Sequence, residues 1–219
     1  MADKLHVYEN AAIKVTYDAS RCIHFAACVR GLPAVFDPRK RPWVAPDEAS
    51  PDAIADVVER CPTGALHFER KDGGAAEVPD AENSVLVSAH GPIYLRGDLE
   101  VMGAYNTVQR RETRLALCRC GQSRNKPYCD GSHTAAKFTD PAVAPATARF
   151  ASAEEAPAGG TLRIEATANG PLVLRGPLRL MDAQGDVVGR MTRCILCRCG
   201  HSKEKPFCDG SHTAAGFTG

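Results

Sequence analysis

Residues 118–133 read CRCGQSRNKPYCDGSH, and residues 197–212 read CRCGHSKEKPFCDGSH. The second stretch follows the first at an offset of 79 residues (118 to 197), and the same offset relates Phe138 to Phe217 outside the stretches. Because an insertion or deletion between these points would break the register, the repeated unit is longer than the stretch itself. Two copies of one small cysteine-rich domain are therefore expected in the C-terminal part of the chain.

Each copy carries three cysteines and one histidine that could hold a metal. Such thiolates and imidazoles suit either tetrahedral zinc or an iron–sulfur cluster. A single residue separates the first two cysteines, whereas paired zinc cysteines usually have at least two between them, and four ligands also satisfy two irons bridged by sulfide. The spacing favours a cluster and leaves zinc open. The candidate ligands are Cys118, Cys120, Cys129 and His133 in the first copy and Cys197, Cys199, Cys208 and His212 in the second.

The pattern CxCGxSxxKPxCDGSH resembles the signature of the CDGSH iron–sulfur domain family (mitoNEET-like), and both copies match it at every ligand position. The resemblance implies one 2Fe–2S cluster in each copy, held by the three cysteines and the histidine. Members with one copy form homodimers, so tandem copies imply the same dimer built within one chain. We therefore expect a monomer with internal pseudo-twofold symmetry.

A different cysteine pattern lies near the N-terminus. Cys22 and Cys28 occupy the outer positions of a C-x2-C-x2-C ferredoxin run, Phe25 occupies the middle one, and Cys61-Pro62 supplies the remote partner. The segment resembles a divergent single-cluster ferredoxin domain that lacks one ligand. Three cysteines imply a 3Fe–4S cluster. The alternatives are a 4Fe–4S cluster with His24 or an external group as fourth ligand, or three buried thiols without a cluster.

The fold class expected from these patterns is α+β. A small ferredoxin-like α/β domain over residues 1–72 should precede two β-rich CDGSH domains, over 84–140 and 161–219, arranged as an intramolecular pseudo-dimer. In the first domain, residues 13–17 alternate like a strand, Ser50-Pro51 begins a helix, and residues 65–68 form a second strand. Connectors rich in glycine, alanine and proline should separate the domains.

Composition narrows the class of protein further. Ten cysteines without a secretory segment indicate metal ligands rather than disulfides, and no stretch approaches the ~18 apolar residues of a membrane helix. We therefore expect a cytoplasmic protein that binds no membrane. Arginines and lysines beside the ligands, such as Arg119 and Arg198, either offset cluster charge around a solvated rim or steer an acidic partner. Because no aromatic platform accompanies them, nucleic acid is not an expected partner.

The predicted function is electron transfer or redox sensing, with iron–sulfur cluster transfer or iron homeostasis as the alternative. The expected partner is a redox protein or an apo cluster acceptor. No catalytic set, phosphate loop or dinucleotide fingerprint is visible, so we expect no enzyme activity. Cys194 corresponds to Leu115 in the first copy, which favours a buried core position over a spare ligand.

Overall fold

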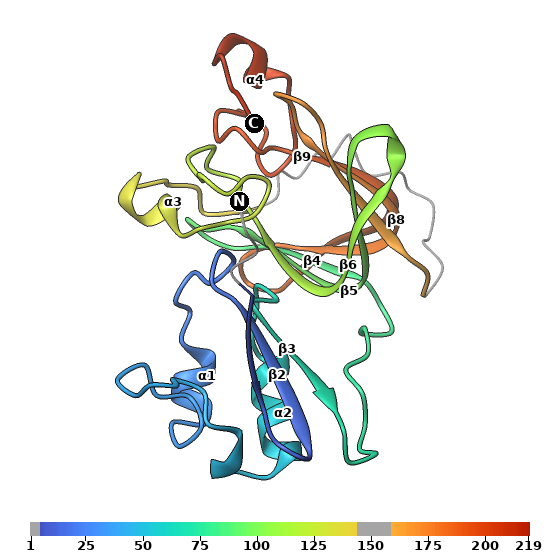
Figure 1. Ribbon diagram of the computed structural model, residues 1–219. Helices are drawn as coiled ribbons and strands as arrows, with labels where there is room; N and C mark the ends of the chain where they lie inside the picture. Colours follow the sequence, from blue (N-terminus) through green and yellow to red (C-terminus); the bar gives the residue numbers. More distant parts are fainter. Residues whose placement is uncertain (1–4, 144–158) are drawn as a thin grey trace. The chain divides into compact units, whose positions relative to one another are not determined.

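The computed structural model describes residues 5–143 and 159–219. The chain divides into two compact units, Met1–Val78 and Pro79–Gly219 (Figure 1). Strands predominate in the second unit, whereas the first unit combines three strands with three short helical elements, so the fold is α+β. Most of the second expected connector, residues 144–158, lies outside the described part of the chain.

The first unit is built on a three-stranded antiparallel sheet with the order β1-β2-β3. Val15 of β2 lies opposite Phe68 of β3, and both side chains are buried, whereas β1 exposes most of its residues at the edge of the sheet. The expected strands are confirmed, and β1 is an addition that the sequence did not predict. The strands are β1 (Leu5–Glu9), β2 (Ile13–Asp18) and β3 (Leu66–Arg70).

The helix α2 (Pro51–Glu59) begins where its sequence predicts. Ser50 caps it by accepting a hydrogen bond from the Ala53 N–H at 3.3 Å, and Pro51 occupies the first turn. Ile54, Ala55, Val57 and Val58 form its buried face. They join the strand side chains in a core with Phe36 and Val44, and this core fixes the loops that carry the cysteines. The remaining helices of the unit are α1 (Ala27–Gly31) and η1 (Pro46–Glu48).

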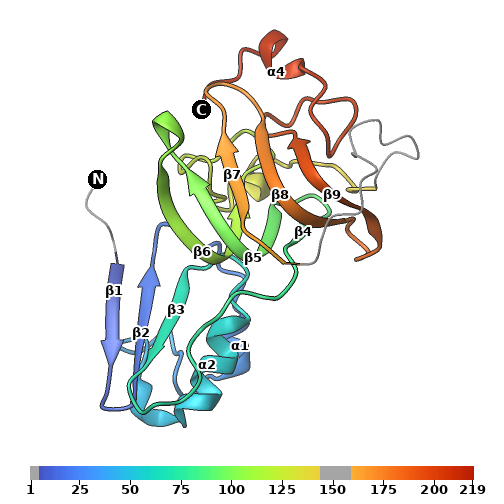
Figure 2. The ribbon, with the colours of Figure 1, turned by 90° about the vertical axis from the view of Figure 1, so that its right-hand side faces the viewer.

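Six strands form one sheet in the described part of the second unit, three from each copy of the repeat (Figure 2). In each copy two long strands, β5 with β6 or β8 with β9, pair as an antiparallel hairpin. The first copy supplies β4 (Ser84–Val87), β5 (Ile93–Met102) and β6 (Val108–Leu117), and the second supplies β7 (Leu162–Ala166), β8 (Leu172–Met181) and β9 (Val187–Leu196). Short elements follow them: η2 (Ala104–Asn106), α3 (Ser132–Ala135) and α4 (Ser211–Ala214).

The two copies exchange strand pairings reciprocally. In its first half β5 pairs with β4 of its own copy, and in its second half it pairs with β7 of the other copy. In the same way β8 pairs first with β7 and then with β4. The register shifts that separate the halves surround Gly97 and Gly176, which occupy equivalent positions and both have positive φ.

This exchange gives both copies one hydrophobic core. Leu95 and Leu99 of β5 are fully buried in the same cluster as Ile164 of β7 and Leu174 of β8. Two carboxylates add ion pairs between the copies. Glu100 of β5 contacts Arg163 of β7 at 3.1 Å, and Glu82, just before β4, contacts Arg179 of β8 at 3.4 Å. The two copies of the repeat therefore bury apolar side chains in one shared core. Within the described residues, no helix has the length and apolar character needed to cross a membrane.

Candidate metal centres

In the first copy, β6 leads directly into a closed ligand loop. The Cys118 N–H donates to the Pro127 carbonyl at 2.8 Å, and the Cys129 N–H donates to the Ala116 carbonyl at 2.9 Å. Leu117 and Tyr128 form an antiparallel bridge between these bonds. The sheet ladder thus continues into the loop and brings Cys129 back beside Cys118.

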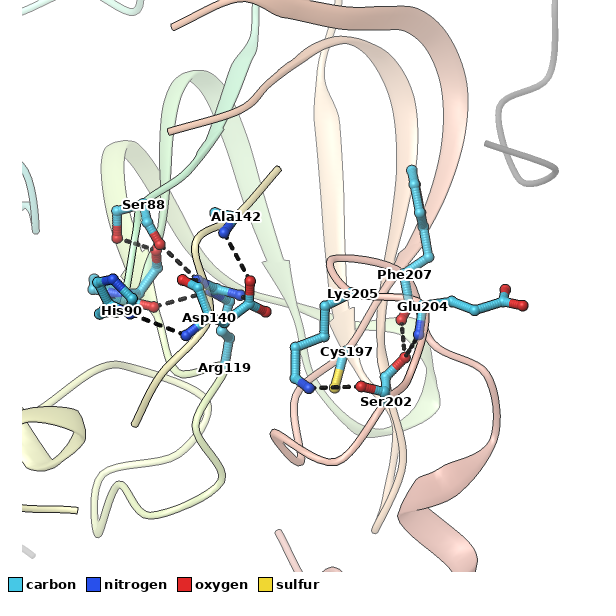
Figure 3. A network of polar contacts seen from close by, with 12 residues as sticks. Ser88, His90, Arg119, Asp140, Ala142, Cys197, Ser202, Glu204, Lys205 and Phe207 are labelled. Atoms are coloured by element: carbon cyan, nitrogen blue, oxygen red, sulfur yellow. Dashed lines mark hydrogen bonds and ion pairs between the residues drawn. The ribbon is translucent and has the colours of Figure 1, made fainter. Parts of the chain in front are cut away.

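The second copy repeats this loop at the end of β9. The Cys197 N–H donates to Pro206 at 2.8 Å, the Cys208 N–H donates to Ile195 at 3.1 Å, and the bridge joins Leu196 to Phe207. Inside the loop, the Ser202 hydroxyl donates to the Phe207 carbonyl at 2.6 Å (Figure 3). The serine therefore stabilises the turn and does not donate to a sulfur.

The eight candidate ligands form four pairs of atoms. In the first copy the sulfurs of Cys118 and Cys120 are 3.7 Å apart, and Cys129 Sγ is 3.5 Å from His133 Nδ1. The second copy repeats both pairs at 3.7 Å and 3.4 Å. Each copy thus offers two pairs of soft ligands on one loop, and a cluster of two irons needs two ligands on each iron. The donor set and its division into pairs fit a 2Fe–2S cluster.

A short helix presents each histidine. His133 is the second residue of α3, which begins directly after Gly131. Gly131 has a φ of 85°, a left-handed conformation that favours glycine. Asp130, which precedes the N-cap residue Gly131, accepts the Ser132 N–H at 3.0 Å, and its other oxygen accepts the Arg124 N–H at 2.9 Å. Although burial opposes ionisation, these bonds hold the pKa of Asp130 below its ordinary value. The carboxylate therefore ties the histidine helix to the loop.

Burial and mutual contact perturb the thiols. The hydrogen bond between Cys118 and Cys120 lowers the pKa of Cys118 to about 6 and raises that of Cys120. Burial raises the pKa of Cys129 to about 11 and lowers the pKa of His133. Ionising all three thiols together is thus costly unless a cation compensates them, which is the situation of a metal site whose folding and loading are coupled.

Backbone N–H groups face the sulfurs in both copies. Gln122 N donates to Cys120 Sγ and Gly131 N donates to Cys129 Sγ, each at 3.4 Å. The second copy has the equivalent pair of contacts at the same distance, from His201 to Cys199 and from Gly210 to Cys208. Such donors stabilise negative charge on cluster sulfurs and influence the reduction potential.

The two ligand loops contact each other through glycines. A Cβ atom placed on Gly121 would lie 2.5 Å from the Cys199 carbonyl oxygen, and one placed on Gly200 would lie 2.8 Å from the Cys120 carbonyl oxygen. Each glycine therefore packs against the backbone of a ligand cysteine in the other copy. The two candidate centres share one contact surface.

Arg119 and Arg198 are not rim residues, which corrects the sequence interpretation for these two positions. Their exposed fractions are 1% and 2%. Arg119 donates to Ser88 O and Asp140 Oδ2, as Figure 3 shows. It also donates to Gly91 O, and its guanidinium lies 5.0 Å from the ring centroid of Phe138. Arg119 therefore connects the ligand loop to the turn at Ser88 and Gly91 and to Asp140. Its charge alone did not predict this structural role.

The three N-terminal cysteines line one cavity of the first unit. Cys22, Cys28 and Cys61 share it with Trp43, Leu66 and other side chains. The pKa of Cys28 is raised to about 11, mainly by burial and next by the charge of the nearby Cys61 thiolate. The structure thus brings together the three residues that the Cys-Pro pattern singled out.

The position of the absent fourth cysteine is exposed. Phe25 has half of its side chain in solvent and lies in the same cavity as the three thiols. His24 is exposed, has a φ of 57° and lines a neighbouring cavity with Cys22 and Cys28. Across residues 5–143 and 159–219, no three His, Cys, Asp or Glu side chains are gathered as they would be around a single metal ion.

Two families of known proteins match the segments that contain the three candidate ligand sets. The family described as "Iron-binding zinc finger CDGSH type" matches residues 90–134 and 169–213, and that described as "Divergent 4Fe-4S mono-cluster" matches residues 8–71. The chain belongs to the CDGSH iron–sulfur family, in its tandem form. Its N-terminal part is the divergent mono-cluster domain.

The tandem CDGSH protein also resembles a curated bacterial protein. The "Uncharacterized protein YjdI" of Escherichia coli strain K12 and that of strain O157:H7 are each 36% identical to it over 69 residues. The match covers 32% of the tandem CDGSH protein and 80% of each relative. No solved structure matches the chain.

Cys194 occupies a core position in the tandem CDGSH protein, as its apolar counterpart predicted. It is 1% exposed among the core leucines, and burial raises its pKa to about 12. Because the thiolate is the reactive form, we expect Cys194 to resist alkylation in the folded chain and to react after unfolding. Mass spectrometry of iodoacetamide-treated protein measures this, with Cys194→Ala as the blank. Labelling of folded protein at Cys194 would contradict the burial.

Proposed function

We propose that the chain is a multi-cluster iron–sulfur protein for electron transfer or redox sensing. The observation that carries this proposal is the division of the ligands Cys118, Cys120, Cys129 and His133 into two pairs of atoms, repeated in the second copy. Two ligands per iron match a 2Fe–2S cluster. When bound, such a cluster accepts and releases single electrons.

The residues around each ligand set serve this role by holding charge in a fixed environment. The cysteines of the first copy are less than 10% exposed, so the protein shields them from water. The N–H groups of Gln122 and Gly131 and the buried guanidinium of Arg119 place positive charge near the sulfurs. Fixed donors of this kind favour the more negative state of a centre without reorganising when its charge changes.

We further propose that residues 84–140 and 161–219 form an intramolecular pseudo-dimer. The reciprocal pairing supports it, because Ser84↔Arg179 and Arg163↔Glu100 are equivalent pairs with the copies exchanged. The contacts of Gly121 and Gly200 with the opposite ligand loops are likewise reciprocal. A chain that contains both halves of the interface is expected to be a monomer.

For residues 1–72 we propose a ferredoxin-like domain with one cluster held by Cys22, Cys28 and Cys61. Three thiols around one cavity support a 3Fe–4S cluster. The matching family is described as holding a 4Fe–4S cluster, which would need His24 or an external group as fourth ligand. His24 lines the cavity next to two of the cysteines, so the four-iron alternative stays open.

We propose a carrier rather than an enzyme, with a redox protein or an apo cluster acceptor as its partner. The polar groups beside the ligands have structural contacts, since the Ser123 hydroxyl donates to Tyr128 O and Asp130 accepts the Ser132 N–H at the start of α3. The second candidate function, cluster transfer, is favoured by the greater exposure of His133 and His212 compared with most of the ligand cysteines. It predicts maturation of an apo ferredoxin by the loaded chain.

Iron and sulfide analysis with EPR of the anaerobically purified chain tests the proposal. We expect about seven irons per chain, from two 2Fe–2S clusters and one 3Fe–4S cluster. About eight irons would indicate a four-iron centre at the N-terminal cysteines, and about four would mean that these cysteines hold none. A colourless, redox-silent zinc protein would overturn the proposed function.

A further inference from the structure

A second cavity of the first unit extends from the candidate cluster cysteines toward the strand β1. Its volume is about 660 Å³, and it shares Cys22 and Cys28 with the three-cysteine cavity. Unlike the three-cysteine cavity, the second cavity is not lined by Cys61. Its far end lies toward β1. The residues found there are His6, Tyr8, Pro38 and Arg41. The volume is typical of a small-molecule site.

Aromatic rings form one wall of this cavity. The ring of Tyr17 meets Trp43 edge-on, with centroids 4.8 Å apart, and Tyr8 meets Trp43 in the same way at 6.3 Å. The ring centroid of Phe36, which is fully buried, lies 6.0 Å from that of Trp43, so Trp43 packs against the core of the unit. Tyr8, Tyr17 and Trp43 are only half-buried, so core packing does not use their whole surface. Rings held in this way offer faces or edges to another aromatic group.

Arg41 supplies the cation of the cavity. Its Nη1 atom donates to the Pro38 carbonyl at 3.0 Å and to the Lys40 carbonyl at 2.7 Å, which anchors the guanidinium through one nitrogen. Within the described residues, no carboxylate pairs with Arg41, whereas the nearby Arg39 pairs with Asp37 at 3.0 Å. An anchored guanidinium with unpaired charge suits a carboxylate or another planar anion.

We propose that this cavity binds a planar aromatic anion of about two fused rings, such as an aromatic carboxylate. The rings stack or pack edge-on against Tyr8, Tyr17 and Trp43, and the anionic group binds Arg41. A cationic ligand is disfavoured because Arg41 would repel it. The site goes beyond the proposed electron-transfer function, since it is a small-molecule site, and its ligand lies beside Cys22 and Cys28.

Isothermal titration calorimetry of the full, cluster-loaded chain with 2-naphthoate tests the proposal. The neutral isostere 2-naphthamide has the same rings without the charge. We expect 2-naphthoate to bind at least about tenfold more tightly than 2-naphthamide, as a charge-assisted hydrogen bond would give. Arg41→Ala should weaken 2-naphthoate about tenfold and leave 2-naphthamide within about twofold. Tyr8→Leu should weaken both probes.

Lys40→Ala is the matched control, because Lys40 precedes Arg41, is exposed as Arg41 is, carries the same charge and does not line the cavity. It should bind 2-naphthoate within about twofold of the unaltered chain. Equal effects of the two substitutions would overturn the proposal, as would equal affinity for the two probes or no binding by the loaded chain. Binding by cluster-free chain alone would show that the cavity belongs to the cluster site and would also overturn it. Iron content, measured on the same samples, reports failure of the proposed function separately.

Discussion

The Arg119→Met variant should lose about 3–5 kcal/mol of unfolding free energy, because it leaves a buried carboxylate without its cation. Arg119 and Asp140 are 1% and 8% exposed, and Nη1 lies 2.6 Å from Asp140 Oδ2. Methionine has similar length and fills the space, but it donates no hydrogen bond to this carboxylate or to Gly91 and Ser88. Urea unfolding followed by circular dichroism measures the loss.

The second copy supplies the matched control. Arg198 donates to the backbone oxygens of Gly170, Thr167 and Gly219 and meets no side-chain carboxylate at the position of Asp140. Thr167 and Gly219 each keep a backbone N–H partner when the arginine is removed. Arg198→Met should therefore cost less, about 1–3 kcal/mol.

The double variant Arg119→Met, Asp140→Asn separates the ion pair from packing. Asparagine removes the buried charge, so the double variant should be more stable than Arg119→Met alone. Equal losses from Arg119→Met and Arg198→Met, together with no recovery in the double variant, would show that the ion pair does not hold the loop.

The candidate ligands could be predicted from the sequence because their chemistry resides in residue type and spacing. Cys118, Cys120, Cys129 and His133 lie on a loop that β6 closes, so local spacing determines which atoms pair. The role of Arg119 could not be predicted in this way. In the sequence, an arginine between two ligands looks like a charged surface residue. Its burial depends on contacts with Asp140 and with the turn at Ser88, which are distant in sequence.

Part of the fold was likewise hidden from local patterns. After Val108, β6 runs through the polar stretch QRRETR, in which Gln109 and Arg111 are exposed and Arg114 is buried, before it ends on the apolar residues LAL. The sequence therefore resembles a polar loop, although pairing with β5 makes it a strand. The exchange of β4 and β7 between the copies depends on register shifts at Gly97 and Gly176 and on contacts between copies, which no single-copy pattern contains.

Gly121 and Gly131 distinguish conformational strain from contact between the copies. Both have positive φ, at 79° and 85°, so an alanine is strained at either position. Gly131 has no heavy atom within 4 Å of an added Cβ, whereas the Cβ on Gly121 would lie 2.5 Å from Cys199 O. At Gly121 an alanine therefore also clashes with the backbone of Cys199, a candidate ligand of the other copy.

Gly121→Ala should therefore cost about 2–3 kcal/mol more than Gly131→Ala, whose loss should be about 1–2 kcal/mol from backbone strain alone. Because the Cβ displaces the segment around Cys199, we also expect iron to be lost from the second copy although the substitution lies in the first. Unfolding free energy and iron per chain measure the two effects. A chain in which His212 and Cys208 are both replaced by alanine has no second centre to lose, so Gly121→Ala should lower its iron content less than in the parent chain.

The reciprocal substitution Gly200→Ala completes this comparison. Its Cβ would lie 2.8 Å from Cys120 O, slightly farther than in the first case, so its cost should be somewhat smaller and its iron loss should fall on the first copy. If Gly121→Ala and Gly131→Ala lose the same stability and iron, the ligand loops do not press on each other. If each alanine affects only the centre of its own copy, the two centres are independent, and the shared contact through Cys120 and Cys199 does not couple them.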